Sequence, residues 1–298
     1  MVPELQITAA NLLCPVCRGV MADEEFNNVL SNVLIELASP DESKLAAASA
    51  VVAVLLSQAP EGRTLSPIVL PALLPLLSSN NLLIQRNGCE ALIAVAELEA
   101  ATLRINMDQW QQALEIVAGQ LRADSTHVAL RITCAEVLGV VGSSNGQAAA
   151  AVFKHQGVEA LLTTLRPETD SDLQGAGLDS LCKLAAEPDN RHYLTDKGVL
   201  TALVQVLDSS SREVQVRVLL CLGMLMGDNQ QQQVKLAEAA GALPQLLQLR
   251  RQKDDEDCKQ IADGIVAALL KNPQCKQQLA DALISQNAGG TKLDKYVS

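Results

Sequence analysis

A recurring arrangement of helical segments restricts the fold of this chain more than any other feature of its sequence. Between residues 146 and 250 a glycine recurs at positions 157, 198 and 241, at intervals of 41 and then 43 residues. A short helical pattern ends at each glycine, an apolar segment follows it, and a longer amphipathic segment comes after a polar turn. Repeats of this length are typical of stacked helical units, which bury their apolar faces against one another.

The longer amphipathic segments share one spacing of apolar or small residues. They begin near residues 45, 84, 130, 173, 214 and 257, and in each the matching positions are i, i+4, i+5, i+8 and i+11, with Asp257 as the polar exception. This spacing forms one stripe on an α-helix. The sequence therefore predicts an all-α fold of about six stacked repeats.

A shorter apolar segment precedes each long one from the second onward. These segments cover residues 67–77, 111–121, 157–165, 198–207 and 241–249. The first two lack the glycine, and there we expect Ser66-Pro67 and Asp108 to start the helix, through a capping oxygen or a proline in the first turn. The repeats are predicted to span residues 25–286, between an N-terminal extension at 1–24 and a C-terminal tail at 287–298.

The composition narrows the classes of partner. The chain has 298 residues, of which 48% are hydrophobic and only 2% aromatic, and its formal net charge is −11. This charge argues against binding nucleic acid or anionic lipid through a general basic field. The longest apolar runs, such as 45–56, are far shorter than the roughly 20 residues of a membrane span.

Cysteine usage and the first residues indicate a compartment. Glu4 stands where a secretory signal would have basic residues, and no clear apolar core of a signal follows. Six of the eight cysteines fall singly inside predicted helices, as buried thiols of a reducing compartment do. We expect a cytoplasmic protein, with a nuclear or ciliary location as alternatives.

These features resemble the armadillo (ARM) repeat family. The resemblance rests on a short first helix ending at Gly157, Gly198 or Gly241, an apolar second helix and an amphipathic third helix. It covers roughly residues 25–286 and is clearest between 146 and 250. The related HEAT repeat usually has two helices, so three helices favour ARM. The resemblance implies a right-handed α-solenoid whose third helices line a concave groove, where members bind extended peptides or partner helices.

In members of the importin-α and β-catenin type, a Trp and an Asn four residues apart on successive third helices hold the bound peptide backbone. The matching Trp positions here hold Val51, Glu90, Glu136, Asp179, Leu220 and Asp263. The matching Asn positions hold Leu55, Ala94, Val140, Lys183, Met224 and Ala267. Because no repeat has the pair, the comparison argues against binding of nuclear import signals.

The residues at these positions define a candidate partner-binding groove. Its members are Glu90, Glu136, Val140, Asp179, Lys183, Leu220, Met224 and Asp263. The four carboxylates are either solvated surface groups or a row that steers a basic partner. Leu220 and Met224 either pack between repeats or form an apolar pocket for a partner side chain.

Other motifs give weaker indications. Cys14-Pro-Val-Cys17 resembles the opening of a RING or U-box-like module. A structural zinc site needs four ligands, however, and no further cysteine or histidine lies near these two cysteines in the sequence. We expect a plain capping segment there, with a zinc site, or an interchain or redox role, as alternatives. His127, His155 and His192 are expected at helix ends or on the surface, and Trp110 between repeats.

No recognisable catalytic motif, P-loop or dinucleotide loop occurs in the sequence. We therefore expect a non-enzymatic adaptor or scaffold with no cofactor and no metal, whose partner is a protein, such as a basic extended peptide or helix. Three alternatives remain: a nucleotide-exchange cofactor of Hsp70 chaperones, a ligase-type fragment resting on Cys14 and Cys17, and a fixed subunit of a cytoskeletal or ciliary assembly.

Overall fold

The computed structural model describes residues 23–59, 63–100, 107–123, 127–208, 211–251 and 255–293. Within these ranges the chain forms helices and turns and contains no strand, which confirms the all-α prediction. The chain divides into two compact units, unit 1 within Met1–Leu161 and unit 2 within Leu162–Ser298. The motif Cys14-Pro-Val-Cys17 lies outside the described residues.

The helices follow the order of the predicted segments. Unit 1 contains α2 (Asp23–Glu36), α3 (Glu42–Ser57), α4 (Ser66–Leu77), α5 (Leu82–Ala100), α6 (Met107–Arg122), α7 (Val128–Ser144), α8 (Gly146–Lys154) and most of α9 (Gly157–Thr163). Unit 2 contains α10 (Ser171–Ala186), α11 (Pro188–Asp196), α12 (Val199–Val206), α13 (Arg212–Met226), α14 (Gln230–Glu238), α15 (Ala242–Leu249), α16 (Glu256–Lys271) and α17 (Pro273–Leu293).

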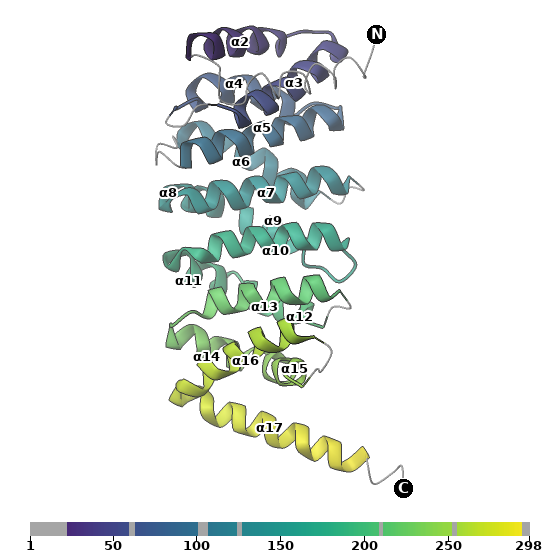
Figure 1. The fold of residues 1–298 in the computed structure, drawn as a ribbon, viewed down its shortest axis with the longest axis vertical. Coiled ribbons are helices and arrows are strands. Elements are labelled where there is room, and N and C mark those ends of the chain that lie inside the picture. Colours follow the sequence, from purple (N-terminus) through teal and green to yellow (C-terminus); the bar gives the residue numbers. More distant parts are fainter. Residues whose placement is uncertain are drawn as a thin grey trace. The chain divides into compact units, whose positions relative to one another are not determined.

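The predicted long amphipathic helices are α3, α5 and α7 in unit 1 and α10, α13 and α16 in unit 2. Within each unit, successive members of this set pack side by side, with shorter helices against them (Figure 1). The last helix continues to Leu293, beyond residue 286 where the solenoid is predicted to end. The outer boundaries of the repeat region otherwise remain predictions.

Polar residues directly before several helices provide their first hydrogen bonds. The carboxylate of Asp41 accepts a bond of 2.9 Å from the backbone N–H of Ser43 at the start of α3. Asp170 accepts from Asp172 at 3.0 Å at the start of α10 in the same way. These side chains satisfy backbone donors that the helix itself leaves without a partner, which is why the helices begin where they do.

The recurring glycines turn out to have two different physical roles. Gly198 and Gly241 immediately precede α12 and α15 with φ of 83° and 86°, a left-handed conformation that glycine adopts at little cost. In the repeat that contains Gly157, the left-handed residue is instead the preceding one, Gln156, with φ of 60°. Gly157 is needed for space, because a Cβ there would lie 2.9 Å from the backbone oxygen of Val152.

The start of α4 differs from the expectation that Ser66 would provide the capping oxygen. The residue at the cap position, Leu65, makes no side-chain capping bond, although Pro67 does lie in the first turn. The acceptor is the carboxylate of Glu99, from the end of α5, which receives the backbone N–H of Leu65 at 2.9 Å and that of Ser66 at 2.6 Å. A carboxylate is favourable there because a helix N-terminus carries partial positive charge.

Glu99 is fully buried, and its burial raises the pKa of the carboxyl, against the lowering effect of its bonds to Ser66 and Leu65. A buried carboxylate loses its hydration and therefore holds its proton more tightly. Glu99 is thus a titratable group whose hydrogen bonds connect the end of α5 to the start of α4.

Replacing Glu99 with glutamine is expected to change how the stability of unit 1 depends on pH. Since the folded-state pKa lies above the unfolded value of about 4.3, the stability gained from protonation is present below that value and is lost as the pH rises through the folded pKa. Glutamine does not titrate in this range. The free energy of unfolding of the wild-type chain should therefore fall relative to that of Glu99→Gln over this interval.

Urea denaturation at a series of pH values, followed by the fluorescence of Trp110 in unit 1, measures this difference. Glu97→Gln is the matched control, because Glu97 is an exposed carboxyl on the same helix. A difference between wild type and Glu99→Gln that does not vary with pH, or that varies in the opposite direction, would contradict the assignment.

Each unit has its own core, built mainly from leucine, valine and alanine. In unit 1 the side chain of Trp110 on α6 is 0% exposed, as predicted for a residue packed between repeats. In unit 2 the buried faces of α10 and α13 contribute Leu181, Leu184, Leu222 and Leu225. Small apolar side chains suit this core because they allow neighbouring helices to approach closely.

Candidate functional site

The candidate residues of unit 1 lie on the long helices α5 and α7. Glu90 is half-buried on α5, and its Oε1 lies 2.9 Å from Nε of Arg86, one turn earlier on the same helix. Glu136 on α7 is exposed. Val140, one turn after Glu136, is only 8% exposed and packs into the unit. Unit 1 therefore offers two surface carboxylates at the predicted positions.

In unit 2 the carboxylates of the row already have arginine partners. Asp179 on α10 accepts from Nε of Arg217 on α13 at 2.9 Å, and Nη1 of Arg217 also donates to Glu213 at 2.7 Å. Asp263 on α16 is paired with Arg250, which directly follows α15. The predicted acidic row is thus, in this unit, part of a network that joins neighbouring helices.

A third arginine adds ion pairs between α13 and the start of α16. Arg212, the first residue of α13, lies 3.0 Å from Oδ2 of Asp255 and 2.7 Å from Oδ2 of Asp257, at the start of α16. The pKa of Asp255 is lowered, mainly by the hydrogen bond that it accepts from the backbone of Cys258 and further by Arg212. The carboxylate of Asp255 is therefore held in its charged form.

These ion pairs form what we term the ion-pair cluster of unit 2. Its members are Asp179, Arg212, Glu213, Arg217, Arg250, Asp255, Asp257 and Asp263. Carboxylates outnumber guanidinium groups in it, five to three, so the cluster keeps a negative charge. Much of the charge that sequence reasoning assigned to a free acidic row is nevertheless neutralised within the chain.

Exposed apolar side chains occur on the same two helices, α13 and α16. Leu220 is 43% exposed and Met224 39% exposed, one turn apart on α13, so neither is packed into the core. Leu270 on α16 is 45% exposed. We term Leu220, Met224 and Leu270 the exposed apolar set. Exposed large apolar residues on neighbouring helices are a feature of interaction surfaces.

Sequence reasoning missed Leu270. The signal was available in the spacing, because Leu270 follows Asp263 by seven residues and therefore lies on the same face of α16. Lys183 on α10 is exposed, as its predicted surface position requires. The structure thus places Lys183, Leu220, Met224 and Asp263 on long helices of unit 2 with accessible side chains.

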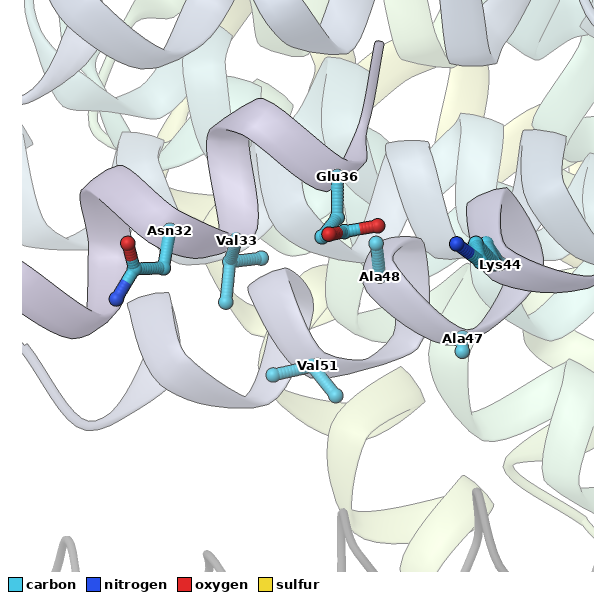
Figure 2. Close-up of a pocket in the computed structure, with 7 residues that line it drawn as sticks. All are labelled: Asn32, Val33, Glu36, Lys44, Ala47, Ala48 and Val51. Atoms are coloured by element: carbon cyan, nitrogen blue, oxygen red, sulfur yellow. The ribbon is translucent and has the colours of Figure 1, made fainter. Parts of the chain in front are cut away.

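A pocket of about 380 Å³ opens between α2 and α3 in unit 1. Figure 2 shows Asn32, Val33 and Glu36 from α2 facing Lys44, Ala47, Ala48 and Val51 from α3. In Figure 2 Asn32 and Lys44 lie toward opposite ends of the pocket, and Glu36 lies between them, near Ala48. The volume and the apolar lining suit an apolar side chain or a small apolar group.

The three histidines lie next to helix ends or on the surface. His127 and His155 lie directly before α7 and after α8, and His192 is exposed with Nδ1 3.0 Å from Asp196, which confirms their predicted positions. Among the described residues, no three histidine, cysteine or acidic side chains gather in a way that could hold a metal ion. No helix in the described part is long and apolar enough to cross a bilayer.

The sequence matches no protein family and no curated protein. Solved structures, in contrast, resemble it over most of its length. An engineered protein from the Northeast Structural Genomics Consortium is 22% identical, with a TM-score of 0.66 over 83% of this chain and 96% of that one. A computationally designed armadillo repeat protein for modular peptide recognition is 21% identical, with a TM-score of 0.64 over 80% and 98%.

A further designed armadillo repeat protein, solved in complex with the peptide (KR)4, is 20% identical, with a TM-score of 0.64 over 80% of this chain and 98% of that one. At this level of identity the likeness shows the fold. The chain therefore has an armadillo-like repeat fold, in agreement with the helix order described above.

Proposed function

We propose that this chain is a non-enzymatic protein-binding scaffold, and that unit 2 holds a segment of its partner on the exposed faces of α13 and α16. The observation that carries the proposal is the exposed apolar set, Leu220, Met224 and Leu270, on helices that also bear the negatively charged ion-pair cluster. Apolar anchors surrounded by charged groups are the usual composition of a protein interface.

The side chains on this surface favour a helical partner segment over an extended one. Met224 and Ala267 stand where peptide-binding armadillo proteins carry an asparagine, and neither side chain forms hydrogen bonds to a peptide backbone. An extended peptide would lose hydration at its backbone groups without replacement, which is costly. An amphipathic helix satisfies these groups internally and presents apolar side chains at helical spacing.

The negative charge of this surface indicates which side chains the partner helix carries beside its apolar stripe. The ion-pair cluster keeps a negative charge, and the whole chain carries −11. Basic side chains beside the apolar stripe of a partner helix would therefore be attracted. The designed armadillo protein in complex with (KR)4 supports the compatibility of this fold with basic peptides. In unit 1 we propose Glu90 and Glu136 as further contacts for basic side chains.

A labelled model peptide tests the proposal directly. The probe is an amphipathic leucine–lysine helix, compared by fluorescence anisotropy with a scrambled peptide of equal composition and with (KR)4. We expect the helix to bind most tightly, and binding to weaken as salt screens the attraction. We expect the double variant Leu220→Lys, Met224→Lys to weaken it at least about tenfold, since it places two charges at an apolar contact.

Ile68→Lys is the matched control. Ile68 is 60% exposed on the shorter helix α4, so this variant also adds a lysine at an exposed apolar position but outside the proposed surface. Binding that is unaffected by the double variant, or weakened equally by Ile68→Lys, would refute the proposed surface. Equal affinity for the scrambled peptide would refute the helical partner.

A further inference from the structure

Two cysteines of unit 2 contact each other across neighbouring long helices. Cys182 on α10 and Cys221 on α13 lie close enough for each thiol to shift the pKa of the other, on helices that pack side by side. Cys182 lies three residues after Asp179, and Cys221 four residues after Arg217, so the thiol pair lies about one helical turn beyond the ion pair of 2.9 Å that joins the same helices. The ion pair therefore holds α10 and α13 in a register that keeps the two sulfur atoms together.

The two thiols differ in the way that a reactive pair requires. Cys182 is half-buried, whereas Cys221 is fully buried. Hydrogen bonding with Cys221 lowers the pKa of Cys182, against the raising effects of burial and of the Asp179 charge, and Arg217 has a smaller lowering effect. The same hydrogen bond, together with burial, raises the pKa of Cys221 well above its ordinary value. The accessible thiol is therefore the one that more readily forms a thiolate.

We propose that Cys182 is a site of oxidation by hydroperoxides such as hydrogen peroxide, and that Cys221 resolves the oxidised form, which joins α10 to α13 through a disulfide. This inference rests on unit 2 alone and is independent of the proposed binding function.

The chemistry proceeds in two balanced steps. In the first, the Cys182 thiolate attacks one oxygen of hydrogen peroxide, the O–O bond breaks, and Cys182 sulfenic acid and hydroxide form. In the second, the sulfur of Cys221 attacks the sulfur of Cys182, the S–O bond breaks, and a disulfide and water form, with the proton of the Cys221 thiol carried by the water. Hydrogen peroxide is the only oxidant required. One of its oxygen atoms leaves as hydroxide in the first step, and the other leaves as water in the second.

The chain contains a comparison pair of the same kind. Cys89 on α5 and Cys134 on α7 also lie on neighbouring long helices, with their sulfur atoms 3.9 Å apart, but both are 0% exposed. The hydrogen bond with Cys134 and burial raise the pKa of Cys89 well above its ordinary value. Both pairs join neighbouring long helices, but only the unit 2 pair has a partly exposed thiol, that of Cys182. We expect the pair in unit 1 to resist oxidation.

The experiment uses the full chain with Cys14→Ser and Cys17→Ser, so that these two cysteines do not compete. The reduced protein is treated with hydrogen peroxide, remaining thiols are alkylated, and the digest is examined by mass spectrometry without reduction. We expect a linked peptide pair that contains Cys182 and Cys221, reversed by dithiothreitol, and oxidation of Cys89 at least roughly ten times slower.

Single variants separate the two roles. In Cys221→Ser we expect the sulfenic acid of Cys182 to accumulate and to be trapped by dimedone, whereas in Cys182→Ser the Cys221 thiol should stay reduced. Far-UV circular dichroism verifies that both variants are folded. Oxidation of Cys182 no faster than that of Cys89, a linkage to a different cysteine, or oxidation of Cys221 in the absence of Cys182 would overturn the proposal.

Discussion

Replacement of Trp110 by alanine should lower the free energy of unfolding of unit 1 by about 3–5 kcal/mol. Trp110 is the only tryptophan of the chain, and its side chain is 0% exposed on α6, which packs against α4, α7 and α8. Removing the indole takes away its buried apolar surface and leaves a cavity that these helices fill only in part. In a stack of repeats such a defect weakens the packing interfaces on both sides of the altered helix.

Urea denaturation followed by far-UV circular dichroism measures this loss, because the variant has no tryptophan fluorescence. Trp110→Phe is the matched control, since it keeps an aromatic ring and should lose less stability than the alanine variant. A loss below about 1 kcal/mol for Trp110→Ala would mean that the side chain is not packed as described. In the wild-type chain, the emission of the buried indole should shift to longer wavelength when unit 1 unfolds.

The second large effect is expected at Gly177 on α10. A Cβ at this position would collide with Oγ1 of Thr164 and lie 2.9 Å from Cβ of Thr164, a residue that is itself fully buried. Gly177→Ala should therefore destabilise unit 2 by about 2–3 kcal/mol, the cost of overpacking in a tightly packed region. The usual preference of helices for alanine over glycine, about 1 kcal/mol, acts in the opposite direction and is outweighed.

Gly264 on α16 provides the opposite case in the same unit. Among the described residues, no atom outside its own helix and chain neighbours lies within 4 Å of a Cβ built at Gly264. Gly264→Ala should consequently stabilise unit 2 by up to about 1 kcal/mol. Adding Thr164→Gly to Gly177→Ala should recover part of the loss. If Gly177→Ala and Gly264→Ala shift the urea midpoint in the same direction, the close contact with Thr164 does not exist.

Most of the fold could be predicted because the information is local. The stripe of apolar residues in each long helix depends on the 3.6-residue period alone, and it correctly located α3, α5, α7, α10, α13 and α16. The glycines at 198 and 241 were recognisable as helix boundaries for the same reason, since their positive φ is a property of one residue. At Gly157 the repeat was right but the reason was different, because the constraint there comes from the space taken by Val152.

The candidate site was predictable in position but not in electrostatic character. Helical spacing placed Asp179 and Asp263 on accessible faces, and both are found there. Their partners Arg217 and Arg250 belong to other segments, 38 and 13 residues away in the sequence, so a pattern within one helix could not reveal them. Leu220 and Met224 were equally open to a core or a surface assignment until their exposure was known.

The amino-acid pattern alone thus established the repeat length, the helical class and the faces that helices turn inward, because each depends on residues close together in the chain. The tertiary structure decided which charges are paired within the chain, which thiols are neighbours, and what Glu99 and Gly177 contact. These depend on atoms brought together from different helices, such as Cys182 with Cys221 and Gly177 with Thr164. Contacts of that kind are set by packing geometry, which no local periodicity records.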